Sequence, residues 1–315
     1  MELRSYGGYR VDGSKAHVPW LTLAGPRSRF GLVWVQTHMN ITVDNNLEVL
    51  EIQLLLEGIY RRYGFDFRDY AYASLKRRIA NLLQAERLQT PEELLHRLLH
   101  DPACMERFLL QLSINTTAMF RDPGFYRAIR DKVLPQLRTY PFVRLWLVGC
   151  STGEEVYSMG ILLREEGLHE RCRIYATDMN EAVLAKAKSG IFPLAAMKEY
   201  TKNYIDAGGT RAFSEYYTAR YENVLFQPSL TQNVVFAQHN LVTDSSFNEF
   251  QAILCRNVMI YFNRSLQDRV HGLLYDSLCH FGFLGLGTKE SIKFTPHEAC
   301  YEEVDGIYRL YQRTK

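Results

Sequence analysis

The sequence lacks the features that mark membrane-spanning and secreted proteins. Its 315 residues contain no apolar run near the ~20 residues that a membrane-spanning helix needs. The first residues show no apolar core followed by a cleavage site, so the pattern does not indicate a secretion signal. We therefore expect a cytoplasmic protein that does not insert into a membrane.

Cysteine is scarce, and no two cysteines form a C-x-x-C pair. The nine histidines form no H-E-x-x-H motif, so neither residue type has the spacing of a zinc site. A chain of this length also needs no disulfides to hold its core together. We expect no bound metal and six reduced thiols, at Cys104, Cys150, Cys172, Cys255, Cys279 and Cys300.

Neither sign of charge dominates the sequence. The 37 Lys and Arg residues nearly balance the 35 Asp and Glu residues, leaving a net charge of +2. Proteins that bind nucleic acid usually concentrate basic residues on one surface, so we expect no nucleic-acid partner. With 47% hydrophobic residues, the composition is that of a globular protein.

The chain divides into three parts by pattern. Residues 1–38 are rich in Gly, Ser and Arg and show no sustained period, which predicts a leader that is disordered or of artificial origin. A short docked segment between Trp20 and Trp34 is the alternative. Residues 39–138 show helical spacing of leucines, and Thr90-Pro91-Glu92-Glu93 is typical of a helix start. We therefore predict an all-α N-terminal domain over 39–138.

Residues 139–315 alternate short apolar runs with helical stretches. Such alternation predicts an α/β domain with a mostly parallel, Rossmann-like sheet covered on both faces. An insertion at about 193–232, rich in Tyr and Phe, interrupts the alternation and is expected to hold a helix and a small β element. The apolar runs are Val143–Val148, Arg173–Thr177, Val234–Ala237, Ala252–Cys255, Phe283–Leu286 and Ile307–Tyr311.

The first apolar run ends in a glycine-rich turn, Gly149-Cys150-Ser151-Thr152-Gly153, before a helical stretch. Such a turn lets a ligand approach the backbone and the free N–H groups of a helix start. Asp178 closes the next run, where a carboxylate can accept hydrogen bonds from ribose hydroxyls. Together these features predict a nucleoside cofactor without choosing which one.

Three classes of protein compete for this turn. A dinucleotide dehydrogenase needs G-x-G-x-x-G, and Glu154 and Glu155 would repel a pyrophosphate. A hydrolase needs G-x-S-x-G, which is present, but Asp178 comes too early for the usual order of a triad. S-adenosylmethionine carries a sulfonium and an ammonium, which acidic residues suit. The third class, a methyltransferase, therefore fits best.

Three blocks of sequence resemble the CheR-type family of chemotaxis-receptor glutamate O-methyltransferases. They are Asn115–Asp122 (NTTAMFRD), Gly149–Ser158 (GCSTGEEVYS) and Cys255–Phe262 (CRNVMIYF), and the match extends over about residues 46–311. The resemblance implies methyl esterification of glutamate side chains on methyl-accepting chemotaxis receptors, with S-adenosylmethionine as cofactor and S-adenosylhomocysteine as product.

The resemblance also implies roles for particular residues. Arg121 and Tyr261 would be catalytic, with Tyr261 near the transferred methyl group. One or both of two adjacent glutamates would hold the amino-acid part of the cofactor. The cofactor-binding residues would be Asn115, Thr117, Arg121, Glu154, Glu155, Asp178, Asn240, Leu241, Arg256 and Asn257.

The implied partner is the cytoplasmic helical region of the receptors. Basic residues at Arg61-Arg62 and Lys76-Arg77-Arg78 could steer an acidic helix, or could simply form a solvated helix face. Some relatives bind a receptor's C-terminal peptide on an insertion that contains Gly. Residues 213–230 contain none, so we expect action that is independent of such a tether.

Two departures from the family pattern could alter substrate choice. Met119 stands where the family has an aromatic residue, and Thr288-Lys289 stands where it has His-Ser. The alternative function is a catalytically silent member that binds the cofactor and acts as a signalling scaffold.

Overall fold

The computed structural model describes residues 40–112 and 117–315 of the chain. The expected leader 1–38 and the predicted site residue Asn115 lie outside these ranges. By contacts the chain divides into one unit over Met1–Leu47 and another over Glu48–Lys315, and the description below concerns the second. Within the described ranges, no helix has the length and apolar character needed to cross a membrane.

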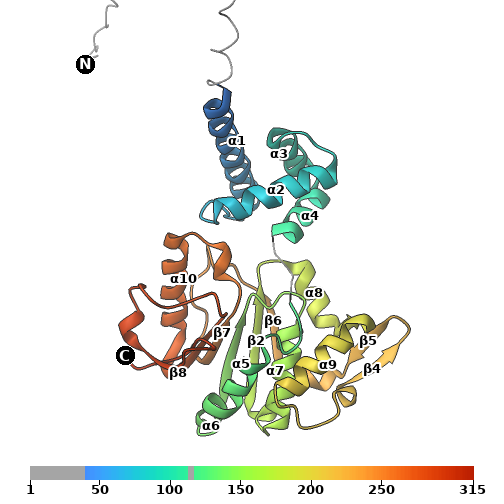
Figure 1. The fold of residues 1–315 in the computed structure, drawn as a ribbon, viewed down its shortest axis with the longest axis vertical. Coiled ribbons are helices and arrows are strands. Elements are labelled where there is room, and N and C mark those ends of the chain that lie inside the picture. Colours follow the sequence, from blue (N-terminus) through green and yellow to red (C-terminus); the bar gives the residue numbers. More distant parts are fainter. Residues whose placement is uncertain (1–39, 113–116) are drawn as a thin grey trace, which may run out of the picture. The chain divides into compact units, whose positions relative to one another are not determined.

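The N-terminal part is entirely helical, as predicted (Figure 1). Its helices are α1 (Asn40–Tyr63), α2 (Tyr72–Glu86), α3 (Pro91–His100) and α4 (Pro102–Leu112). They enclose a core of their own, because one apolar face of each helix is turned inward. The buried residues include Ile52, Leu55, Ile59, Phe67, Ile79, Leu94, Leu98 and Phe108.

The predicted helix start at Thr90 is confirmed. The Thr90 hydroxyl accepts a hydrogen bond from the Glu93 backbone N–H at 3.2 Å, and the Glu93 carboxylate accepts one from the Gln89 N–H at 2.6 Å. Pro91 occupies the first helical position, where no N–H is needed. The local sequence therefore fixes where α3 begins.

The second part is built on a seven-stranded sheet in the order β6-β2-β1-β7-β8-β10-β9 (Figure 1). The five strands from β6 to β8 pair in parallel, and β10 and β9 add an antiparallel edge. This confirms the predicted Rossmann-like sheet. The strands are β1 (Val143–Val148), β2 (Cys172–Asp178), β6 (Val234–Gln238), β7 (Phe250–Cys255), β8 (Leu278–Leu286), β9 (Tyr301–Asp305) and β10 (Leu310–Arg313).

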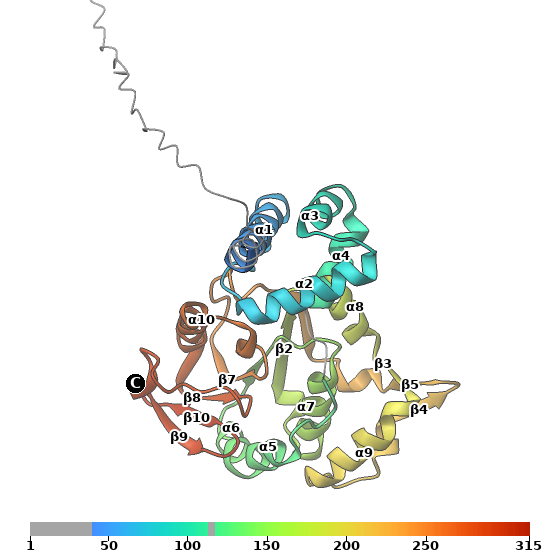
Figure 2. The ribbon, with the colours of Figure 1, turned by 45° about the horizontal axis from the view of Figure 1, so that its top comes forward.

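Helices bury both faces of this sheet (Figure 2). Along β1, Leu145 and Leu147 belong to one core cluster, whereas Trp146 and Val148 belong to the other, because successive side chains of a strand point to opposite faces. The first cluster includes side chains of α7 (Glu154–Glu165) and α8 (Glu181–Ser189), and the second includes those of α10 (Arg264–Ser277).

Residues 119–137 also pack into the first of these clusters. They form α5 (Pro123–Ala128), a π-helix (Ile129–Val133) and α6 (Leu134–Leu137). The predicted division at residue 138 assigned them to the helical domain, because their pattern is helical. Because their apolar side chains are buried in the same cluster as those of the sheet, we describe them together with the sheet below.

The insertion holds a helix and a small sheet. Its elements are β3 (Ile191–Pro193), α9 (Met197–Asp206), β4 (Tyr217–Arg220) and β5 (Asn223–Phe226), with the strands in the antiparallel order β3-β5-β4.

The last expected strand was placed incorrectly at 307–311. The structure has a hairpin of β9 and β10 there, because the Asp305 carboxylate accepts hydrogen bonds from the N–H groups of Ile307 and Tyr308, both at 3.0 Å. Such a side-chain acceptor is typical of a turn.

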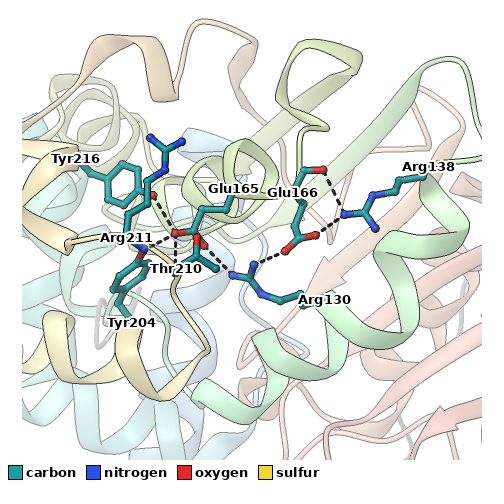
Figure 3. Close-up of polar contacts among 8 residues, drawn as sticks. All are labelled: Arg130, Arg138, Glu165, Glu166, Tyr204, Thr210, Arg211 and Tyr216. Carbon is teal, nitrogen blue, oxygen red and sulfur yellow. Dashed lines mark hydrogen bonds and ion pairs between the residues drawn. The ribbon is translucent and has the colours of Figure 1, made fainter.

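A buried carboxylate joins the insertion to the rest of the sheet domain (Figure 3). The side chain of Glu165, at the end of α7, is 1% exposed and accepts hydrogen bonds from Tyr204, from the Tyr216 hydroxyl at 2.9 Å and from the Thr210 N–H at 3.1 Å. Arg130, from the π-helix, pairs with it at 2.8 Å. Burial favours a higher pKa for Glu165, but these partners outweigh it and hold the pKa below its ordinary value.

We predict that Glu165→Ala lowers the free energy of unfolding by about 3 kcal/mol, because it removes a buried ion pair and several charge-assisted hydrogen bonds. The exposed Glu170 is the matched control, and Glu170→Ala should change the value by less than about 0.5 kcal/mol. Denaturant unfolding followed by circular dichroism measures both. Equal stability of the two variants would contradict this role.

The Glu165 contribution should also depend on pH in a defined direction. Because the folded-state pKa is lowered, the stabilisation is complete above the ordinary value near 4.5 and is lost as the pH falls through the lowered value. The difference in the free energy of unfolding between the wild type and Glu165→Ala should therefore stay constant near neutral pH and decrease only below the ordinary pKa of a glutamate.

Candidate functional site

A cavity opens at the carboxyl ends of β1, β2 and β7, where parallel sheets usually bind ligands. It holds about 740 Å³ of empty space, counted out to its mouth and including open solvent. Both halves of the protein contribute to its wall. The lining includes Phe67, Tyr70 and Leu112 from the helical part and Gly149, Ser151, Asp178, Met179, Asn240, Leu241, Asn257 and Tyr261 from the sheet part.

A second, more polar cavity of about 450 Å³ adjoins the first and shares Gly149, Ser151 and Asn257 with it. Its other lining residues include Thr117, Arg121, Tyr126, Glu155 and Arg256. The two cavities together form an elongated site around the glycine-rich turn, apolar at one end and charged at the other.

The turn after β1 needs glycine for two physical reasons. Gly149 and Gly153 have φ values of +65° and +98°, which side-chain-bearing residues rarely adopt. A Cβ atom at Gly153 would also lie 3.0 Å from the Ala187 Cα of α8. The turn can therefore pass this close to α8 and beside the cavity only with glycine at these two positions.

Asp178 stands at the junction of the sheet and the larger cavity. Its side chain accepts hydrogen bonds from the N–H groups of Ser151 and Asn180, both at 3.0 Å, and the residue is 8% exposed. Burial raises the pKa of Asp178, although these N–H groups act against the rise. The carboxylate is thus held in place with acceptor capacity left for hydroxyl groups of a ligand.

The structure separates the two adjacent glutamates at the start of α7. Glu155 lines the polar cavity and pairs with Arg256 at 2.8 Å. Glu154 is buried away from both cavities and accepts hydrogen bonds from the Thr152 hydroxyl at 2.6 Å and the Tyr200 hydroxyl at 3.3 Å. Burial raises the pKa of Glu154. Of the two glutamates, Glu155 alone lines a cavity.

Arg256 lines the polar cavity and contacts the side chains around it. Its guanidinium lies between Glu155 and Asp122, at 2.8 and 2.7 Å, and over the Phe125 ring at 4.0 Å. Burial disfavours its charge, but Glu155 outweighs this and raises the pKa of Arg256. Its charge is therefore compensated within the protein, so we infer that its side chain orients Glu155 more than it binds a ligand.

The remaining predicted residues are divided between the two cavities. Thr117 and Arg121 line the polar one, and Asn240, Leu241 and Tyr261 line the larger one. Asn257, with a left-handed φ of +60°, lines both. All of the predicted residues that the structure describes thus converge on this site except Glu154.

Sequence reasoning missed Glu290, which shapes the turn after β7. Its buried carboxylate accepts four backbone hydrogen bonds, from Asn257, Val258, Met259 and Gly287, at 2.7 to 2.9 Å. Burial raises the pKa of Glu290 against the effect of these donors. The sequence shows only an acidic residue three positions after the glycine that follows a strand. This pattern is too common to identify a functional residue.

Arg78 was noted in sequence only as one of three basic residues on a helix. In the structure Arg78 is buried, and its guanidinium lies over the Tyr261 ring, 4.4 Å from the ring centre. One nitrogen of this guanidinium, Nη1, donates a hydrogen bond to the carbonyl of Leu112. The helical part therefore places a cation directly against the tyrosine of the larger cavity.

This geometry defines a class of protein. A Rossmann-like sheet, a glycine turn without a full dinucleotide motif, an acidic residue after β2 and a glutamate at the charged end fit S-adenosylmethionine, with its ribose and its ammonium group. The chain is a methyltransferase with a binding domain for this cofactor.

Comparison with known proteins identifies the family, and the chain belongs to the CheR methyltransferases. Residues 115–305 match the family model described as the CheR methyltransferase SAM-binding domain, and residues 50–113 match its all-alpha domain. The chain is 50% identical to a putative methyltransferase, Cher3, of Pseudomonas putida over 87% of this chain and all of that one. It is 28% identical to a chemotaxis protein methyltransferase of Listeria innocua, covering 74% of this chain and 87% of that one.

Likeness to solved structures is weak over the whole chain. The N-methyltransferase NodS of Bradyrhizobium japonicum, in complex with S-adenosylhomocysteine, has 13% identity and a TM-score of 0.30, over 62% of this chain and 70% of that one. PKMT2 of Rickettsia typhi has a TM-score of 0.28, and the chain spans only 21% of its length.

We predict that Glu290→Gln weakens S-adenosylhomocysteine binding roughly tenfold, because the new amide N–H₂ would face two N–H donors and displace the turn that carries Asn257. Glu222, exposed at a hairpin tip, is the control, and Glu222→Gln should bind like the wild type. Isothermal titration calorimetry on folded variants measures the affinities. Wild-type affinity in Glu290→Gln would disprove the positioning role.

Proposed function

We propose that this protein methylates the carboxylate of glutamate side chains on the cytoplasmic helical region of chemotaxis receptors. Its membership of the CheR family supports the reaction class, and the names of several relatives point to chemotaxis. The assignment of a carboxylate as the acceptor rests on Arg78, whose buried charge beside the larger cavity is balanced by no carboxylate among the described residues.

Arg78 is a buried cation that forms no ion pair among the residues that the structure describes. Two of its guanidinium nitrogens, Nε and Nη2, have no hydrogen-bond partner among the residues that the structure describes. Burial lowers the pKa of Arg78, while Tyr261 and Tyr70 act against this, and no carboxylate in the described ranges is among the causes. An uncompensated buried charge is costly, and an incoming carboxylate near Tyr261 would relieve that cost.

The residues around the site have separable proposed roles toward the cofactor. Asp178 would hold the ribose hydroxyls, Asn240 and Leu241 would line the adenine, and Glu155 would hold the ammonium group. Thr117 and Arg121 would contact the remaining amino-acid part, where the planar fork of Arg121 suits a carboxylate. When bound, S-adenosylmethionine supplies a methyl group on a sulfonium, which an acceptor oxygen can take.

The protein needs no general base for this reaction. A glutamate with a pKa of about 4.3 is already ionised at neutral pH, so its oxygen is ready to accept the methyl group. Alignment of the two reactants is then the main task of the protein, and alignment can supply roughly 7–11 kcal/mol of the barrier. Tyr261, held between Arg78 and the cavity, would fix the position of the acceptor.

We also propose that the protein acts in the cytoplasm and without a peptide tether, since its insertion lacks glycine between residues 213 and 230. Some of the basic side chains predicted to steer an acidic helix already form ion pairs within the protein. Arg61 pairs with Glu57 and Lys76 with Glu48, both at 2.7 Å. Arg78 is therefore the better candidate for contact with the acceptor. Nothing in the site favours a silent scaffold.

The direct test of the proposal uses cofactor labelled in its methyl group and a helical receptor fragment. We expect transfer of label to the fragment and its release as methanol in mild base, as an ester requires. A fragment with glutamines at the acceptor positions should take up none. Base-stable label, or equal labelling of the glutamine fragment, would refute carboxylate methylation.

We predict that Arg78→Met lowers turnover about a hundredfold while S-adenosylhomocysteine affinity stays within about twofold, because Arg78 acts on the acceptor. Methionine has a similar volume, and replacing a buried charge in this way usually preserves stability. Arg77, the exposed neighbour, is the control, and Arg77→Met should keep wild-type turnover. Equal turnover of Arg78→Met and Arg77→Met would refute the proposed role of Arg78 toward the acceptor.

We predict that Asp178→Ala weakens S-adenosylhomocysteine binding about tenfold to a hundredfold, since it removes a charged acceptor from the proposed ribose site. Asp276→Ala, at an exposed position on α10, should leave the affinity unchanged. Calorimetry measures both, and an unchanged affinity in Asp178→Ala would count against the ribose assignment.

A further inference from the structure

A separate cleft lies beside the turn that carries Tyr261. It holds about 690 Å³ of empty space, counted to its mouth, between α10, Met259-Ile260 and the loop after β8. None of its residues lines the two cofactor cavities. We call it the Lys289 cleft, and the side chains used below are Arg264, Lys289, Lys293 and Phe294.

Two lysines give the cleft positive charge. Lys289 and Lys293 are exposed, and neither forms an ion pair within the described ranges of the chain. The acidic side chains nearby already have other partners. Glu290 points inward to four backbone N–H groups, Asp268 pairs with Arg264 at 3.3 Å, and Glu298 accepts from the Phe294 N–H at 2.7 Å.

Phe294 adds a large exposed apolar surface between these charges. Its side chain is 86% exposed, and its φ of +62° is unusual and strained for a bulky residue. Hydrogen bonds fix this conformation from both sides, since Arg264 donates to the Phe294 carbonyl and Glu298 accepts from its N–H. Strained residues held in this way cluster at binding sites.

We propose that the Lys289 cleft docks an acidic amphipathic helix of the acceptor protein. Carboxylates on the helix would meet the two lysines, and an apolar side chain would pack on Phe294. The proposal rests on the proposed function, in which the acceptor is a helical protein. Nucleic acid fits less well, because the chain as a whole is nearly neutral.

The position of the cleft makes docking useful to the reaction. Glu290 lies between the two lysines in sequence and holds the backbone N–H groups of Asn257 and Met259. The loop that forms the cleft is thus bonded directly to the turn that leads to Tyr261. A helix bound here is anchored close to the acceptor site, so docking raises the local concentration of its glutamates.

The test measures binding of a fluorescein-labelled, glutamate-rich helical peptide by anisotropy, with no methyl donor present. We expect Lys289→Glu with Lys293→Glu to weaken binding about tenfold, and Phe294→Ser to weaken it severalfold. The control is Lys188→Glu with Lys198→Glu, which changes the net charge equally at exposed sites elsewhere. It should bind within about twofold of the wild type. Calorimetry with S-adenosylhomocysteine should give unchanged affinity in all variants.

Three results would overturn the proposal: no peptide binding by the wild type, equal losses in the test and control variants, or no loss in either. A peptide with glutamine in place of glutamate should bind weakly, and equal binding of this peptide would also overturn it. The outcome is distinguishable from that of the proposed function. If binding depends on the cleft but no methyl group is transferred, the docking proposal is supported and the proposed reaction is refuted. If methyl groups are transferred but binding does not depend on the cleft, the reaction is supported and the docking proposal is refuted.

Discussion

Four backbone N–H groups converge on the buried carboxylate of Glu290, and the shape of the active site depends on this contact. The turn after β7 contains Asn257 in a left-handed conformation, which asparagine tolerates, and the Glu290 carboxylate accepts a hydrogen bond from the Asn257 N–H. A Cβ atom at Gly287 would lie 2.7 Å from the Glu290 carboxylate, so the neighbouring glycine is part of the same arrangement. One buried carboxylate therefore fixes a wall that both cofactor cavities share.

Two buried arginines at the site differ in how their charge is balanced. Arg256 lies between Glu155 and Asp122, so its charge is matched and its side chain is fixed. Arg78 stacks on Tyr261 with no carboxylate against it in the described part of the chain. A matched charge orients neighbours, whereas an unmatched one attracts a ligand of opposite sign. The contrast gives the cofactor end and the acceptor end of the site their separate proposed roles.

Much of the sheet could be predicted from local sequence. The runs that became β1, β2 and β7 are mostly apolar because most of their side chains are buried on one face or the other, and Gly149 and Asp178 mark where two of them end. The rest depended on packing. Glu154 and Glu155 are adjacent on a helix, about 100° apart, so only the packed helix decides which one reaches the cavity. The burial of 119–137 and the partners of Glu290 arise from residues distant in sequence.

The proposed reaction requires that the turn after β7 bring the cofactor and an acceptor carboxylate together at Tyr261. A crystal structure with S-adenosylhomocysteine and a glutamate-containing receptor helix would show whether it does. We expect the glutamate carboxylate within hydrogen-bonding distance of Tyr261 or Arg78, and the cofactor sulfur beside it. A bound cofactor with the glutamate on another surface, and with no anion near Arg78, would refute the proposed reaction.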